Sequence, residues 1–185
     1  MGESRFTIHD EVENVGHHVT PHMYLYHCNA GFPVVDEGSR LLVPASATTT
    51  DYGVPIEGYR TLSAPLPDFT EACFEHELVA EPDGRVPVAV VNRGRGIGVY
   101  QVFRIEQLAH HTVWRMMGED TYALAMEPST NRDAGRWDAR TRGELLSLQP
   151  GEVREYDLEI GALDGEAAID GFAQRVERIA GAAPG

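Results

Sequence analysis

The sequence predicts a mainly β protein, an antiparallel β-sandwich followed by one C-terminal helix. Short segments that alternate apolar and polar residues recur along the chain, and turn sequences separate them. This arrangement is typical of antiparallel sandwiches and barrels. A helical spacing of apolar residues is confined to residues 164–180. With 185 residues, of which 42% are hydrophobic, the chain is long enough for one domain with a substantial core.

The strands are expected in the first 160 residues. In residues 6–12, Phe6, Ile8 and Val12 share one face, and polar residues lie between them. Further strands are expected at 23–29, 40–43, 71–79, 86–92, 96–105, 121–127 and 152–160. Residues 44–68 contain several prolines and are expected to form a long loop of the kind that often borders a functional site.

The helix is expected over residues 164–181, with Asp164 as its N-cap and Gly181 as its end. Its apolar residues recur at steps of three and four and are Ile169, Phe172, Ala173, Val176 and Ile179. The sequence shows no domain boundary, so we expect a single domain over residues 1–185, with the sandwich at about 6–160.

The charge of the chain excludes several classes of partner. Acidic residues (29) outnumber basic residues (15), for a formal net charge of −14, and every basic residue is arginine. Such a surface repels phosphate backbones and anionic lipid head groups, so we expect neither nucleic acid nor a membrane as partner. The N-terminus lacks the pattern of a secretory signal, and two cysteines are too few for a disulfide scaffold. We therefore expect a cytoplasmic protein.

Glu127 is the first candidate for chemistry. In residues 121–127 the bulky side chains of Tyr122, Leu124 and Met126 share a face that we expect to be buried. Glu127 lies on the other face, behind two alanines that leave space in front of its carboxyl group, as a binding site requires. A solvated glutamate at a strand end is the alternative interpretation.

His27 is the second candidate. The alternation in residues 23–29 places Leu25, His27 and Asn29 together and turns Cys28 the other way. A Cys–His nucleophilic dyad is therefore not expected, and Cys28 is interpreted as a small core residue. His27 could transfer protons, or it could be a packed, hydrogen-bonded histidine.

Other polar and aromatic residues have two interpretations each. His22 belongs to a group of four N-terminal histidines, but the chain contains no His-x-His pair of the kind that cupins use to bind a metal, so we predict no metal site. Asp36 could be the second carboxylate that glycoside hydrolysis requires, or part of a polar turn. Trp114 could stack on a sugar ring, or it could be packed in the core.

Five motifs, in this order, resemble a sparsely characterised branch of the aldose 1-epimerase (galactose mutarotase-like) family. They are His-Met-Tyr-Leu-Tyr-His-Cys-Asn-Ala-Gly-Phe-Pro from His22, Val-Asp-Glu-Gly-Ser-Arg from Val35, Trp-Arg-Met-Met from Trp114, Met-Glu-Pro-Ser-Thr-Asn from Met126 and Leu-Gln-Pro-Gly-Glu from Leu148. The resemblance covers roughly residues 6–160 and corresponds to the C-terminal portion of the family's β-supersandwich only.

The resemblance implies an isomerase that interconverts sugar anomers with no metal or organic cofactor. It implies that His27 is the general acid and Glu127 the general base, on opposite sides of one monosaccharide or modified sugar. Residues expected to contact the sugar are His22, Asn29, Asp36, Trp114 and Asn131. The segment after Glu127 has Ser-Thr-Asn where the family has a glutamine, which leaves the identity of the sugar open.

Two other functions stay open at the level of sequence. One is a non-catalytic sugar-binding or vestigial half-sandwich, and the other is a metal-dependent, cupin-like sugar isomerase. Because the N-terminal strands of the family have no counterpart here, an exposed sheet edge is expected, and with it a homodimer.

Overall fold

The computed structural model describes residues 4–50 and 53–181. The ends of the expected single domain, residues 1–3 and 182–185, lie outside the described residues. The protein is mainly β, as predicted. Its elements are β1 (Arg5–Glu13), β2 (Thr20–His22), β3 (Cys28–Ala30), β4 (Arg40–Leu42), β5 (Ala45–Thr49), β6 (Ala72–Leu78), β7 (Arg85–Asn92), β8 (Ile97–Arg104), β9 (His110–Met117), β10 (Tyr122–Ser129), α1 (Gly135–Arg142), β11 (Leu146–Leu148), β12 (Val153–Asp164) and α2 (Glu166–Gly181).

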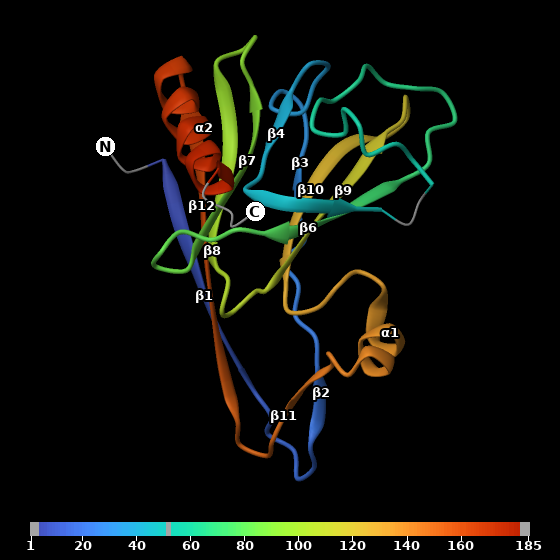
Figure 1. Ribbon diagram of the computed structural model, residues 1–185, viewed down its shortest axis with the longest axis vertical. Helices are drawn as coiled ribbons and strands as arrows, with labels where there is room; N and C mark the ends of the chain where they lie inside the picture. The colour runs from blue at the N-terminus through green and yellow to red at the C-terminus, as the bar shows by residue number, and fades with distance from the viewer. Residues whose placement is uncertain (1–3, 51–52, 182–185) are drawn as a thin grey trace.

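Two five-stranded sheets form the body of the molecule (Figure 1). The first sheet has the strand order β1-β12-β8-β7-β4, and the second sheet has the order β3-β10-β9-β6-β5. All strand pairs within them are antiparallel. A two-stranded ribbon of β2 and β11 extends from the body at the bottom of Figure 1, close to α1.

The main hydrophobic core lies between the two sheets. Val86, Val88 and Val90 alternate along β7, and all three are fully buried in it. From the second sheet, Val113 of β9 and Leu124 of β10 join the same cluster. Because side chains alternate along a strand, filling the inner faces in this way leaves the outer face of the second sheet for other residues.

Helix α2 covers the outer face of the first sheet and confirms the predicted C-terminal helix. Its residues Ile169, Phe172 and Val176 pack in a second cluster with residues of β7. The helix begins two residues later than expected, at Glu166. Asp164 is not its N-cap but the last residue of β12.

The expected strand at 23–29 is only partly formed. The regular ladder covers Cys28–Ala30, and Leu25 makes an isolated bridge to Ser129. Between them, the N–H of Tyr26 donates to the carbonyl of Pro128 at 3.1 Å. Proline has no N–H with which to return the bond, which interrupts the ladder at this point.

Several elements were not predicted. Strand β9 was missed because its inner face carries His111 and Arg115, so that apolar residues do not alternate along it. Strand β5 lies inside the expected long loop at 44–68 and contains no large apolar residue. Helix α1 makes a second helix; it is mostly polar and buries only Ala139.

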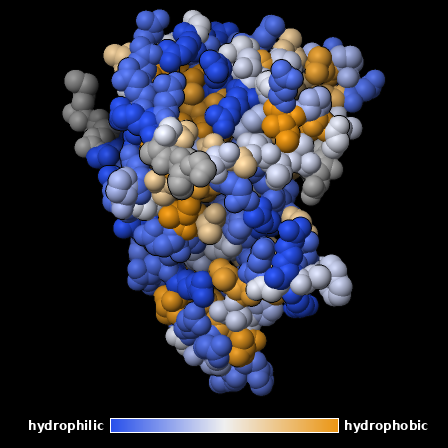
Figure 2. Space-filling view, in the orientation of Figure 1, coloured by the Kyte–Doolittle hydropathy of each residue, from blue (hydrophilic) through white to orange (hydrophobic). Residues whose placement is uncertain are grey.

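The surface is mostly hydrophilic on the face shown in Figure 2, where hydrophobic residues form separate patches. Within residues 4–50 and 53–181, no helix combines the length and apolar character needed to cross a bilayer.

Candidate active site

His27, in the segment just before β3, lies opposite Glu127 of β10 in the second sheet. The bridge of Leu25 to Ser129 and the pairing of Cys28 with Met126 follow one continuous register, which places His27 opposite Glu127. The flanking Tyr26–Pro128 pair is linked by a backbone hydrogen bond, so the His27–Glu127 pair occupies a non-hydrogen-bonded position. Side chains approach most closely at such positions.

The two side chains are in contact. Nε2 of His27 lies 2.9 Å from Oε1 of Glu127, and the side chains are 49% and 5% exposed, respectively. The contact is not aligned as a hydrogen bond, and the buried Oε1 has no hydrogen-bond donor among residues 4–50 and 53–181. The two groups were expected from the sequence on opposite sides of one sugar, whereas in the structure they lie side by side.

Burial raises the pKa of Glu127 to about 7, and the negative charge of Asp133 adds to the effect. Desolvation penalises the ionised carboxylate, whose Oε1 receives no compensating hydrogen bond. A carboxyl group that titrates near neutral pH can both accept and return a proton at physiological pH. The accessible imidazole beside it supplies a second group for proton transfer.

A row of side chains on the same sheet face lies next to the pair. Ala125, two residues before Glu127, pairs with Asn29 on β3 and with Trp114 on β9. Asn29 is exposed, and the ring centroid of Trp114 lies 6.0 Å from that of His27. The indole N–H of Trp114 donates to Glu71 at 2.9 Å, which fixes the ring. The structure thus brings two of the predicted sugar contacts, Asn29 and Trp114, to the face of the catalytic candidates.

Sequence reasoning missed an ionic cluster at the end of β10. Arg132 binds Glu75 at 3.3 Å and Glu77 at 2.9 Å, both on β6. The backbone N–H of Asp133 donates to Glu75 at 2.8 Å. These contacts tie the segment after β10 to the sheet beside Glu127. The available signal was the alternation in residues 71–79, which turns Glu75 and Glu77 to one face.

His22 lies away from this face and does not support its predicted role in sugar binding. It is buried on β2, where its Nε2 is 2.5 Å from the hydroxyl of Tyr156 and its ring stacks on Tyr24 and Tyr156. Burial lowers the pKa of His22. It is therefore a packed histidine.

Asp36 and Asn131 also have structural partners. Asp36 lies in a turn and accepts a hydrogen bond from Arg95 at 3.0 Å, and this guanidinium lowers its pKa. Asn131 is 4% exposed; its Nδ2 donates to the carbonyl of Glu144, and its Oδ1 accepts from Thr130. Through these bonds, both residues hold loops in place.

The described residues contain no group of three or more His, Cys, Asp or Glu side chains arranged to hold a metal ion. Of the N-terminal histidines, His22 packs on Tyr156 while His27 contacts Glu127, so these two do not converge.

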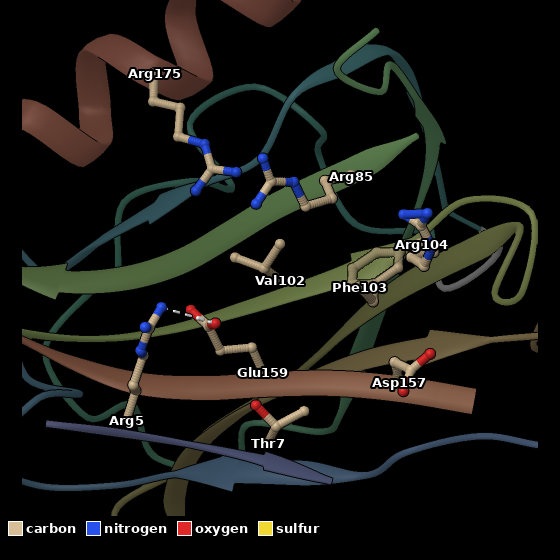
Figure 3. A pocket seen from close by; sticks show the side chains of 9 residues that line it. All are labelled: Arg5, Thr7, Arg85, Val102, Phe103, Arg104, Asp157, Glu159 and Arg175. Atoms are coloured by element: carbon tan, nitrogen blue, oxygen red, sulfur yellow. Dashed lines mark hydrogen bonds and ion pairs between the residues drawn. The ribbon is translucent and has the colours of Figure 1, made fainter. Parts of the chain in front are cut away.

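A separate hollow of about 460 Å³ lies beside α2, over the first sheet (Figure 3). Four arginines line it, and each is paired with a carboxylate, as is common in surface ion-pair networks. The pairs are Arg5–Glu159, Arg85–Asp83, Arg104–Glu106 and Arg175–Glu81. Because these charges balance, we assign no ligand to this hollow.

Solved structures similar to this chain share its fold. A protein from Klebsiella pneumoniae subsp. pneumoniae, described as a candidate aldose 1-epimerase, is 26% identical with a TM-score of 0.91 over 98% of this chain and 48% of its own. A galactose mutarotase related enzyme from Lactobacillus acidophilus is 12% identical with a TM-score of 0.59, over 89% of this chain and 59% of its own. A galactose mutarotase-like protein from Clostridium acetobutylicum is 15% identical with a TM-score of 0.56, over 85% of this chain and 52% of its own.

These similarities confirm the predicted galactose mutarotase-like fold, and this chain spans about half the length of the proteins that share it. No curated protein matches the sequence. A family model matches residues 1–162. This range runs from β1 to Ala162, two residues before the end of β12. The chain therefore belongs to the family described as Domain of unknown function (DUF4432).

Proposed function

We propose that this chain interconverts the anomers of a monosaccharide or modified sugar, with Glu127 as general base and His27 as general acid. The observation that carries the proposal is the contact of an accessible imidazole with a buried carboxyl group whose pKa is raised to about 7. The names of similar proteins, which include an aldose 1-epimerase candidate and mutarotase-like proteins, agree with this chemistry.

The side-by-side geometry suits ring opening. The anomeric hydroxyl and the ring oxygen of an aldose are bonded to the same carbon, C1, so two neighbouring groups can reach both. Glu127 takes the proton of the anomeric hydroxyl while His27 gives a proton to the ring oxygen. The bond between C1 and the ring oxygen breaks, and the open-chain aldehyde forms.

Reclosure uses the same groups in reverse. After rotation about the C1–C2 bond, His27 takes the proton back from the sugar hydroxyl as its oxygen attacks the other face of the carbonyl. Glu127 returns its proton to the carbonyl oxygen, which becomes the anomeric hydroxyl of the other anomer. The pair ends in its starting protonation state, so no further proton donor is required.

Trp114 and Asn29 are proposed to bind the sugar. The indole ring lies beside His27 and offers an apolar face to the C–H groups of a pyranose. Asn29 is exposed on the same sheet face and offers an amide to the hydroxyl groups of the sugar. The roles proposed from sequence for His22, Asp36 and Asn131 are not retained, because each has structural partners elsewhere.

A second candidate function is sugar binding without catalysis. It is favoured by one observation, the 48% share of the Klebsiella structure that this chain covers. The other part of that structure is a place from which further groups would reach a sugar bound to this face. A homodimer could supply such groups, and the edge strands of the two sheets, β1, β4, β3 and β5, offer pairing surfaces for it.

Exchange NMR on a panel of aldoses tests the proposal, because it measures the rate of α/β interconversion directly. We expect the wild-type chain to accelerate exchange of at least one sugar. Glu127→Gln should lower the accelerated rate by about 10²- to 10⁴-fold, the usual contribution of one proton-transfer group. Glu155→Gln, the same chemical change at an exposed site on β12, should leave the rate unchanged.

Equal rates for the wild type and Glu127→Gln would reject Glu127 as the base. Thermal stabilisation by a sugar with no acceleration of exchange would support the binding function instead. Sedimentation of the same samples decides whether the chain is a dimer under these conditions.

A further inference from the structure

A second cavity lies behind the strands that carry the candidate pair. It has a volume of about 300 Å³ and opens beside β3. Its walls are mostly apolar and include Cys28, Met126, Val99 and Ile160. Because side chains alternate along a strand, Cys28 and Met126 point away from the face on which their neighbours His27 and Glu127 lie. The cavity is thus separated from the candidate active site by the second sheet.

One polar side chain in this apolar wall has an unmet hydrogen-bonding group. Gln101 lines the cavity and is 1% exposed. Its Nε2 donates to the backbone carbonyl of Met126 at 3.3 Å, while its Oε1 has no donor among the residues that the structure describes. Rotating the amide would set Oε1 against that carbonyl, so the bond to Met126 fixes the orientation.

An isolated glutamine carbonyl is an unusual feature of a protein interior. Buried polar groups are nearly always paired, because an unpaired one loses its hydration without compensation. Here the unpaired atom belongs to a residue that lines a cavity whose other walls are mostly apolar, with Asn29 as a further polar residue. This is the usual composition of a small-molecule site, an apolar container with one or a few polar groups that orient the ligand.

We infer that this cavity is a binding site for a small, largely apolar molecule that carries one hydrogen-bond donor. The apolar walls take the body of the ligand, and Oε1 of Gln101 accepts the hydrogen bond. The volume is at the lower end of the range of about 300–1,000 Å³ for ligand pockets, which corresponds to a single ring or a short chain. The inference does not rest on the proposed anomer interconversion, since the cavity lies on the opposite face of β3 and β10, although Asn29 of β3 borders both sites.

A pair of probes of equal size tests this site. p-Cresol and p-xylene have the same number of heavy atoms, but only p-cresol has a donor. NMR titration of the wild-type protein should show shifts of the Gln101 side-chain amide and of the Val99 and Ile160 methyl groups with both probes. p-Cresol should bind roughly 2- to 10-fold more tightly, the ratio that one net hydrogen bond produces.

Gln101→Met keeps the length of the side chain and removes the acceptor. In this variant the preference for p-cresol should disappear while p-xylene still binds. Val99→Trp, which fills the cavity, should abolish binding of both probes. Glu127→Gln, on the other face of β10, should change neither affinity, even though it is expected to slow anomer interconversion strongly.

The inference is overturned if neither probe shifts the signals of Gln101, Val99 and Ile160, which would indicate a cavity occupied by water alone. It is also overturned if Gln101→Met retains the preference for p-cresol. Should Gln101→Met fail to fold, nuclear Overhauser contacts from bound p-cresol to the methyl groups of Val99 and Ile160 in the wild type decide the matter. Their absence at saturating probe would exclude binding in this cavity.

Discussion

The second sheet carries two pairs of ionisable side chains in contact, one on each face. On the outer face, His27 and Glu127 approach to 2.9 Å, and the imidazole is 49% exposed. On the inner face, Nδ1 of His76 lies 3.1 Å from Nδ1 of His111, and these residues are only 4% and 1% exposed. His76 and His111 are cross-strand partners, and His27 lies opposite Glu127 in the same way, so the two pairs differ in burial and not in backbone pairing.

The two environments shift proton affinity in opposite directions. Burial lowers the pKa of His76 to about 3 and that of His111 well below its usual value, since an imidazolium cannot be solvated between the sheets. On the outer face, burial raises the pKa of Glu127 to about 7. The inner pair therefore stays neutral and has a packing role, with Tyr59 bonded to His76 at 2.8 Å. The outer pair can exchange protons with a ligand.

The largest expected effect is acid destabilisation through the inner pair. Below about pH 6.5 the unfolded chain protonates both histidines, whereas the folded protein resists protonation until much lower pH. Stability is therefore present above pH 6.5 and is lost as the pH falls, by up to about 2.7 kcal/mol per pH unit for two protons. Urea unfolding between pH 7.5 and 5 measures this slope.

The double variant His76→Gln/His111→Leu should be less stable at pH 7.5, yet its stability should fall less steeply with pH. His22, whose pKa is also lowered, should leave some slope in place. His18→Gln, a change at an exposed histidine, is the matched control. An unchanged slope in the double variant would show that the inner pair is not buried as a neutral pair.

Most of the fold followed from hydrophobic alternation, and the failure at β9 has a clear physical cause. Strand β7 was predicted because its valines alternate into the core. Strand β9, in the middle of the second sheet, was missed because its inward positions include His111 and Arg115. Polar residues that are buried by tertiary contacts remove the pattern on which the prediction depends. His111 and Arg115 also make the inner face of this sheet more polar than the inner face of the first sheet around β7.

Of the residues expected at the candidate site, four lie together on one sheet face, namely His27, Glu127, Asn29 and Trp114, and the others do not. His27 and Glu127 were identified by their motifs, and the strand register brings them together. Asn131 was expected to contact the sugar but is buried by its bonds to Thr130 and Glu144. The orientation of a residue after the end of a strand depends on loop contacts, which alternation does not encode.

A smaller effect of opposite sign is expected from Glu127. The pKa of Glu127 is higher in the folded state than in the unfolded state. Its favourable contribution to the free energy of unfolding is therefore present at low pH and is lost as the pH rises through about 7. Glu127→Gln removes the buried charge and should stabilise the protein at pH 8.5 by about 1–3 kcal/mol. At pH 4.5 the variant and the wild type should differ much less.

Glu155→Gln is the matched control, because this glutamate is exposed, and it should have little effect at either pH. Equal stability of Glu127→Gln and the wild type at pH 8.5 would mean that the carboxylate is solvated or paired with a charged imidazole. The pKa shifts on the two faces of the sheet would then differ less than the structure indicates.

The smallest expected effect concerns the cause of the raised pKa of Glu127. Desolvation is the main cause, and the charge of Asp133 is the lesser one. Asp133→Asn removes that charge but keeps the backbone N–H that donates to Glu75, so the loop should stay in place. The pKa of Glu127, followed by carbon-13 NMR of its carboxyl group, should fall by a fraction of a pH unit and remain above its usual value. Asp138→Asn, on α1 where Asp138 pairs with Arg142, should leave it unchanged. A return of Glu127 to the usual pKa in Asp133→Asn would show that charge repulsion, and not burial, sets the proton affinity of the outer pair.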